Sequence, residues 1–187
     1  MQLQKKKIKI KLSELEKDIL LFFVQSMQRE MKLKTILINY HGKYQQYIVM
    51  EAIVKLCKLG YLLLHTDTTV TFDNPPLLLQ TFMNFERITT AQLLYFIIVQ
   101  NRSTIKKHET ATFNRKMFLI PRLADNRHIS HILTLYCTTK EEIHKSTYEL
   151  VKRGLLYKKG RLNYVFDYNR LDPMLLEYLV RSYQFDG

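Results

Sequence analysis

The sequence predicts a mainly α-helical α+β protein with small β-hairpins, built as two similar units in tandem. The 187 residues are 47% hydrophobic and 25% charged, which is the balance of a folded globular chain. Only 5 glycines and 4 prolines are present, too few for an all-β chain with frequent turns. The third observation is that the same landmarks occur twice along the chain in the same order.

The repeated landmarks are a glycine, a Phe-Asp pair and a proline followed by leucines. They are Gly60, Phe72-Asp73 and Pro75-Pro76 in one unit, and Gly154, Phe166-Asp167 and Pro173 in the other. Upstream of each set, Ile19–Gln25 is similar to Leu94–Gln100. Because a duplicated chain folds into repeated units, we expect one domain over residues 1–85 and a second over 86–187.

In the first unit, Ser13 and Glu16 have the spacing of a capping box and predict a helix over 13–30. A short second helix is expected over 33–40. A third helix is expected over 45–59, followed by a hairpin over 62–72 and a linking helix over 76–84. The expected inner face of the third helix is Ile48, Ala52, Leu56 and Leu59. Gly60 stands where a left-handed C-terminal cap is needed.

The second unit repeats this order. The expected elements are a helix over 90–102, a basic insertion over 103–127 with a strand over 117–120, a short helix over 129–136, a third helix over 141–153, a hairpin over 155–166 and a C-terminal helix over 173–184. Thr139 and Glu142 form another capping-box pattern. Ile143, Thr147, Leu150 and Val151 are expected to face inward. Residues 5–12 alternate charged and apolar side chains, which predicts a further strand.

The stretch from Ile129 to Leu156 resembles the helix-turn-helix of winged-helix transcription regulators and plasmid replication initiators. Thr138–Ile143 gives the turn and helix start, and Leu150–Leu156 gives an apolar-basic ending before the hairpin. The resemblance implies two winged-helix domains in tandem. It also implies that the third helix reads DNA in the major groove and that the hairpin, the wing, contacts the backbone.

A net charge of +12 favours a polyanionic partner, and with this fold we expect double-stranded DNA. The candidate contacts lie in the third helix, the wing and the insertion of the second unit: Lys140, His144, Lys145, Tyr148, Lys152; Lys158, Lys159, Arg161; Lys106, Lys107, Arg115 and Lys116. Base reading is assigned to Lys145 and Tyr148 alone. The excess charge is spread over both units, so a solvated surface is the competing explanation of any single stripe.

The first unit offers a second DNA or partner surface, because its wing lacks basic residues. Its candidates are Gln45, Gln46, Tyr47, Lys55 and Lys58. The apolar stripe of the C-terminal helix has two interpretations: packing on the second unit, or a homodimer contact through Leu175, Leu176, Leu179, Val180 and Tyr183. The expected function is a transcription regulator or replication initiator. The alternative is an accessory subunit that makes protein contacts within a larger nucleic-acid-handling complex.

No catalytic motif is found, so we expect no enzyme and no cofactor. His128, His131, Cys137 and His144 lack the spacing of a zinc site, and no metal is expected. Cys57 and Cys137 are interpreted as buried core thiols of a cytoplasmic protein, associated with the nucleoid if it binds DNA. No apolar run is long enough to span a membrane, and no signal peptide is expected at the lysine-rich start.

Overall fold

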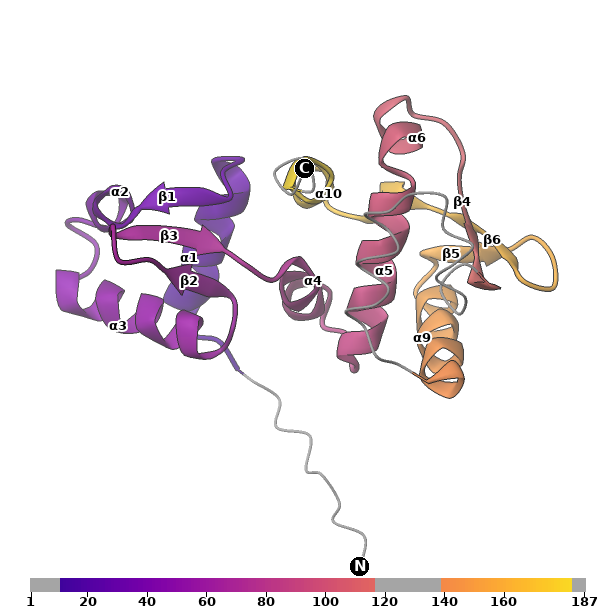
Figure 1. Cartoon of the computed structure of the whole chain (residues 1–187), viewed down its shortest axis with the longest axis horizontal. Coiled ribbons are helices and arrows are strands. Elements are labelled where there is room, and N and C mark those ends of the chain that lie inside the picture. The colour runs from indigo at the N-terminus through magenta and orange to yellow at the C-terminus, as the bar shows by residue number, and fades with distance from the viewer. Residues whose placement is uncertain (1–10, 117–138, 183–187) are drawn as a thin grey trace, which may run out of the picture.

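The protein is a mixed α+β chain with two small antiparallel sheets, one in each half (Figure 1). The computed structural model describes residues 11–116 and 139–182. Both sheets have three strands, and in both the strand that comes last along the chain lies between the other two. The two halves therefore share one sheet topology.

The first half begins with a helix and ends with a hairpin. Its elements are α1 (Glu14–Gln25), β1 (Glu30–Lys32), α2 (Leu33–Asn39), α3 (Gln46–Lys58), β2 (Leu62–Leu64) and β3 (Thr69–Phe72). The expected capping box is present, since Ser13 Oγ accepts from the Glu16 amide and Glu16 accepts from the Ser13 amide. Gly60 has a φ of 81°, a left-handed conformation that a side chain would strain.

The expected helix over 13–30 is shorter than the sequence suggested. It ends at Gln25 because Met27 takes a φ of 52° and turns the chain. Residues 30–32 then form β1, which pairs with β3 in the register Met31 to Val70. This third strand was absent from the expected hairpin, and it completes the sheet.

The inner face of α3 agrees with the expectation at Ala52 and Leu56 and differs from it at the other two positions. Val49, Ala52, Ile53 and Leu56 are buried, whereas Ile48 and Leu59 are only partly buried. The core thus takes β-branched Val49 and Ile53 from the centre of the helix. Lys11 and Leu12 belong to no strand, although Leu12 is buried, and residues 5–10 of the strand expected over 5–12 lie outside the described residues.

The second half has the same sheet order as the first, with a further helix before its first strand. Its elements are α5 (Ile88–Gln100), α6 (Arg102–Lys106), β4 (Ala111–Asn114), α9 (Lys140–Lys152), β5 (Leu156–Lys158) and β6 (Asn163–Phe166). The strand expected over 117–120 and the helix expected over 129–136 lie outside the described residues. The observed first strand of this sheet is β4, which pairs with β6. Val151 is 36% exposed instead of inward, and Ser146 is buried in the α9 face.

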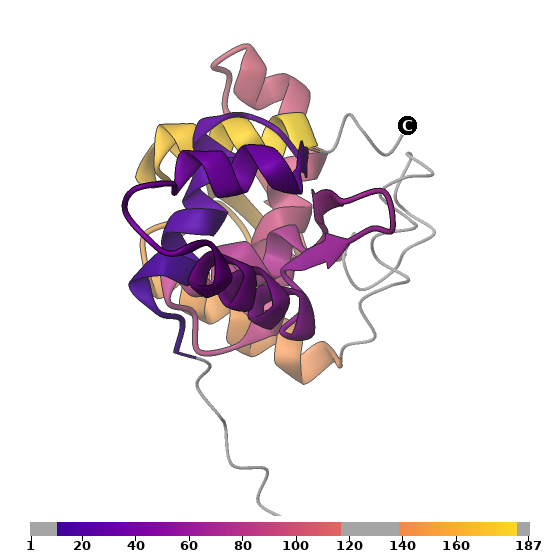
Figure 2. The same cartoon turned by 90° about the vertical axis from the view of Figure 1, so that its left-hand side faces the viewer.

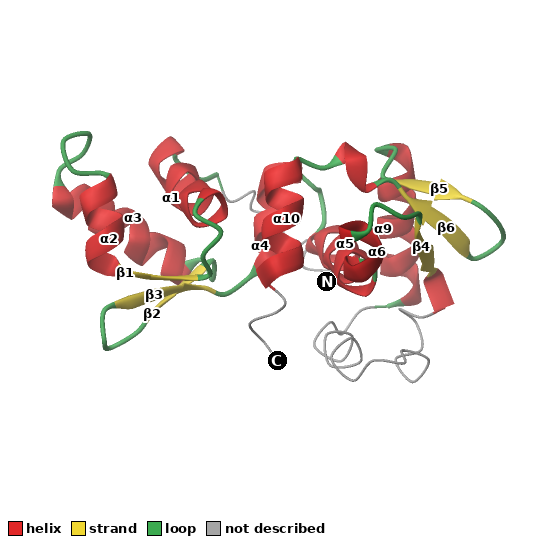
Figure 3. Ribbon diagram, turned by 90° about the horizontal axis from the view of Figure 1, so that it is seen from above, coloured by secondary structure: helices red, strands yellow, loops and turns green. Residues whose placement is uncertain are grey.

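Two further helices lie between the halves. α4 (Pro75–Met83) leads from β3 into α5, and α10 (Pro173–Ser182) follows a short 3-10 turn, η2 (Tyr168–Arg170). Figures 1 and 3 show α4 and α10 side by side at the centre of the molecule, with the sheets toward its two ends. α10 contacts both α1 and α5, and the ring of Tyr178 packs on that of Phe72 with centroids 5.8 Å apart.

The stripe offered as a dimer contact is therefore largely used inside the chain. Leu175, Leu179 and Val180 are buried and Leu176 is partly buried against the core. Tyr183 lies outside the described residues. These buried side chains agree with the first interpretation, in which the helix packs within the chain. The difference is that α10 packs on both halves and not on the second alone.

Candidate nucleic-acid interface

The outer face of α9 carries the side chains expected to read DNA. The helix starts at the cap residue Thr139, whose Oγ1 accepts from the Glu142 amide at 3.2 Å. Its buried face holds Ile143, Ser146, Thr147 and Leu150 against the core. On the opposite face His144, Lys145, Tyr148 and Lys152 are exposed, and Tyr148 is 71% exposed. A phenol that open to solvent is available for a partner.

The second residue of the Thr139 capping-box pattern has a different contact from the expected one. The Glu142 carboxylate lies 3.9 Å from Arg87 Nε, just before α5. The N-terminus of α9 thus contacts the start of α5 and is also capped.

The other end of α9 is fixed to the turn between α4 and α5. Glu149 accepts from Thr90 Oγ1 at 2.6 Å and from the Glu86 amide at 3.2 Å. Arg153 donates to the carbonyls of Met83 and Asn84 at 2.6 and 2.8 Å, and its guanidinium lies 4.7 Å from the Phe85 ring centroid. These contacts hold α9 in one orientation, as a reading helix requires.

A pocket of about 510 Å³ beside α9 brings together basic residues from three separate segments. It is lined by Arg115 and Lys116 after β4, Lys140 at the start of α9, and Arg161 and Leu162 between β5 and β6. The backbone makes this arrangement, because the Arg115 amide donates to the Leu162 carbonyl at 3.0 Å and so extends the β4–β6 pairing. The side-chain amide of Asn114 also donates to Oδ1 of Asn163 at 2.7 Å.

The cations of this pocket differ from the structural cations of the same half. Arg87, Arg153 and Arg170 each have a carboxylate partner. Among the described residues, no acidic side chain lines the pocket, and none of its four cations has an ion pair. The Arg115 guanidinium instead meets the Nδ1 of His144 on the outer face of α9. Converging cations without counter-charges are the arrangement of an anion site.

The remaining candidates of the second half fall into two groups. Lys158 and Lys159 are exposed on the hairpin, next to Arg161, whereas Lys145 is paired with Glu141. That hydrogen bond and charge lower the pKa of Glu141. Lys106 and Lys107 are exposed at α6, where Lys106 lines a separate pocket with Arg181. Figure 1 shows α6 at the upper end of α5 and α9 beside its lower part, and Lys106 and Lys107 do not line the basic pocket.

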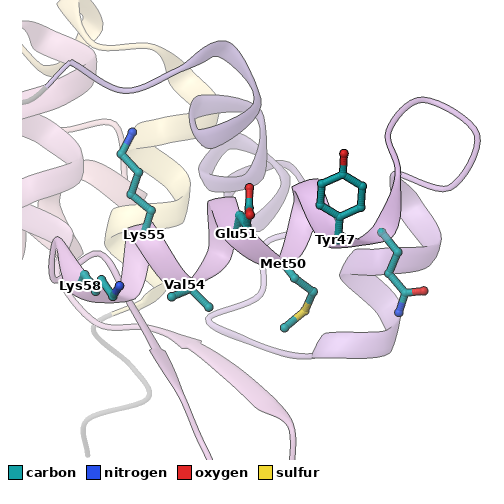
Figure 4. Close-up of a pocket in the computed structure, with 7 residues that line it drawn as sticks. Tyr47, Met50, Glu51, Val54, Lys55 and Lys58 are labelled. Atoms are coloured by element: carbon teal, nitrogen blue, oxygen red, sulfur yellow. The ribbon is translucent and has the colours of Figure 1, made fainter.

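The corresponding surface of the first half is different in character. Gln45 precedes α3, and a groove of about 930 Å³ runs along the helix, lined by Gln46, Tyr47, Met50, Glu51, Val54, Lys55 and Lys58 (Figure 4). Tyr47 is 60% and Val54 38% exposed. The Lys55 ammonium group is already engaged within the chain, because it donates to Glu16 at 2.7 Å.

The first hairpin is neutralised within the chain. The Asp67 carboxylate accepts from Lys32 at 2.8 Å and from the Thr69 hydroxyl at 2.6 Å. These two bonds lower the pKa of Asp67. At the equivalent turn of the second hairpin, Arg161 lines the basic pocket. The absence of basic residues at 65–68, noted from the sequence, therefore corresponds to a hairpin whose one acid is already paired.

Three features of the site were missed from the sequence. Arg153 was noted as part of a motif but anchors α9, and Met50 and Val54 of the α3 groove were not considered as a surface. The helical spacing of Tyr47, Met50 and Val54 would have indicated the groove, had Val49 and Ile53 been placed on the inner face. The contact of Arg115 with His144 depends on strand pairing between distant residues, and no local signal indicates it.

Among the described residues, no group of three His, Cys, Asp or Glu side chains could hold a metal ion, and no helix is long and apolar enough to cross a membrane. His128, His131 and Cys137 lie outside this part, and Cys57 is partly buried, which raises the pKa of its thiol. Neither a family model nor a curated protein nor a solved structure matches the chain.

Proposed function

We propose that both halves are winged-helix units and that the protein is a non-catalytic DNA-binding protein, a transcription regulator or replication initiator. The support for the fold is that each half begins with a helix, places another helix directly before its hairpin, and has the last strand in the middle of a three-stranded sheet. In this proposal α3 and α9 are the third helices, and the β2–β3 and β5–β6 hairpins are the wings.

The observation that carries the DNA proposal is the basic pocket beside α9. Its four cations come from the end of β4, the start of α9 and the β5–β6 turn. A DNA backbone presents closely spaced phosphates, which such a cluster neutralises with release of counterions. Arg115, Lys116, Lys140 and Arg161 are assigned to phosphates, with Lys158 and Lys159 beside them.

Base reading is assigned to the exposed face of α9. Tyr148 and Lys145 stand on this face with His144 and Lys152, and the helix is anchored at both ends. Phosphate contacts hold the helix in register while side chains on it meet base edges. Lys145 would exchange its partner Glu141 for DNA on binding.

The experiment compares two double variants that remove the same charge. Lys116→Ala/Arg161→Ala removes two pocket cations, and Lys106→Ala/Lys107→Ala removes two exposed cations near α6. Binding of each to a random-sequence duplex at low salt is measured by fluorescence anisotropy. The pocket variant is expected to lose about tenfold or more in affinity, since two phosphate contacts are removed. Equal losses of affinity in both variants would show that binding depends on the overall positive charge and not on the basic pocket.

The second candidate function is an accessory winged-helix subunit that uses protein contacts within a larger nucleic-acid-handling complex. The observation that favours it is the exposed apolar part of the α3 groove. A subunit of this kind is expected to copurify with a stoichiometric partner. The Lys145→Ala/Tyr148→Ala variant is then expected to bind that partner as the wild type does.

A further inference from the structure

The outer face of α3 is an apolar surface with no other described element packed on it. Tyr47 and Val54 are exposed and Met50 is partly exposed, all lining the groove of Figure 4. Leu63 and Leu64 of the adjacent β2 are 45% and 42% exposed. Figure 2 looks onto this end of the molecule, with the second half behind it. Apolar side chains gathered on one exposed face are the kind of surface that interaction sites use.

The same positions in the second half are polar. With Gly60 set against Gly154, Met50 corresponds to His144, Glu51 to Lys145 and Val54 to Tyr148. The two halves thus share a backbone order while their outer helix faces differ in chemistry. The basic face is suited to a polyanion, and the apolar face of α3 is suited to a protein surface.

Two charged side chains on the α3 face also lack partners. Glu51 and Lys58 line the groove two helical turns apart, and neither has an ion pair with another described residue. Lys55, between them, is held by Glu16 at 2.7 Å. Glu51 and Lys58 stand on either side of Val54, and an acid and a base in this arrangement form a self-complementary pattern.

A two-fold axis would place each of these charges opposite its counter-charge on the other copy. If two α3 helices pack antiparallel about the midpoint between Val54 and Lys55, Glu51 of each copy lies opposite Lys58 of the other. The Val54 side chains then meet near the axis. Tyr47 extends past the C-terminal end of the other helix, toward the exposed leucines of its β2. Such an interface is isologous, with the same patch on both copies.

We propose that the outer face of α3 is a homodimer interface, in which two copies of this chain pair antiparallel through Val54, Glu51 and Lys58. Two helical turns and a hairpin edge form a small interface compared with the roughly 800 Å² per partner of stable complexes. The dimer is therefore expected to be concentration-dependent, with a dissociation constant on the order of micromolar. Its consequence for DNA, two α9 helices related by a two-fold axis, rests on the proposed function; the dimer itself does not.

Charge reversal tests the register directly. Sedimentation equilibrium of the full chain without DNA is measured for the wild type, for Glu51→Lys, for Lys58→Glu and for the double variant. Each single variant sets like charges opposite each other twice, so dimerisation is expected to weaken at least tenfold. The double variant restores both pairs with exchanged signs and is expected to regain the wild-type dimer. Lys43→Glu, an exposed charge outside the groove, is the control and is expected to dimerise like the wild type.

Several outcomes would overturn the proposal. They are a wild-type chain that stays monomeric throughout the micromolar range, a dimer that neither single variant weakens, or a double variant that fails to recover while circular dichroism shows it folded. A different protein that copurifies in fixed ratio and is released by Glu51→Lys would assign the face to that partner instead. Loss of DNA binding in the pocket variant with the dimer intact concerns the proposed function alone, so the two results are separable.

Discussion

At the residue scale, the charged side chains divide into those held by the fold and those left open. Glu16 is 5% exposed, yet it is charged: burial raises its pKa, but the hydrogen bonds from Lys55 and Ser13 outweigh burial and leave it below the usual 4.5. Arg153 is held by two carbonyls and by Glu149. The four cations of the basic pocket have no ion pair among the described residues, and this difference is the reason for proposing a site there.

Replacing Glu16 by Gln is expected to destabilise the fold by about 1 kcal/mol at neutral pH, because the capping box and the bond to Lys55 both weaken. The folded pKa lies below the unfolded one, so this stabilisation is present above pH 4.5 and is lost as the pH falls through the folded pKa. Urea unfolding at several pH values measures it. Glu14→Gln, at an exposed site, is the control, and an equal loss there would contradict the assignment.

Arg153 and Lys152 provide a matched pair of neighbouring cations. Arg153→Ala is expected to lower stability by about 1–3 kcal/mol, because it removes the anchor of α9 at the α4–α5 turn. Lys152→Ala is expected to leave stability within about 0.5 kcal/mol while weakening duplex binding. Thermal unfolding and duplex titration of both variants check this. A stable Arg153→Ala protein would mean that α9 is held by its apolar face alone.

At the scale of elements, the sequence predicted each long helix and both hairpins near their observed positions, since caps and helical spacing are local signals. Ser13, Gly60 and Thr139 mark three of these ends. It did not predict β1, because three residues pair with β3 only after the chain turns at Met27. The candidate residues of α9 were predictable in the same local way. The contact of His144 with Arg115 was not predictable from the sequence, because it depends on the β4–β6 register.

The α9 helix as an element is predicted to carry sequence preference and not general affinity. Lys145→Ala/Tyr148→Ala is expected to lose discrimination between a selected site and random duplex by about 1–3 kcal/mol, with random-duplex affinity changed little. Both side chains are exposed, so the fold is expected to survive. Competition binding with the two duplexes measures this. Preserved discrimination would move base reading to another element.

At the scale of the whole molecule, α10 makes one body of two repeated halves. It contacts α1 and α5, and Tyr178 is 1% exposed against Phe72. The sequence showed the apolar stripe but not what covers it, because periodicity reports burial and not the partner. Burial raises the pKa of the Tyr178 phenol, whose hydroxyl has no hydrogen-bond partner among the described residues.

Tyr178 therefore gives a two-sided prediction. Tyr178→Ala is expected to lower stability by about 3 kcal/mol or more in a single unfolding transition, since both halves lose a shared contact. Tyr178→Phe is expected to be neutral or stabilising by up to about 1 kcal/mol, because it removes an unsatisfied buried hydroxyl. Met174→Ala, on the same helix but 45% exposed, is the control. Two separate melting transitions in Tyr178→Ala would show that the halves fold independently.

The central claim is that the basic pocket beside α9 binds the DNA backbone, and the salt dependence of duplex binding tests it most directly. The account predicts that the wild-type association constant falls steeply with salt. For Lys116→Ala/Arg161→Ala, the slope of log K against log salt is expected to become shallower by roughly 0.9 for each phosphate contact removed. Lys106→Ala/Lys107→Ala is expected to keep the wild-type slope. A wild type that does not bind duplex at low salt, or slopes that are equal in all three proteins, would contradict the account.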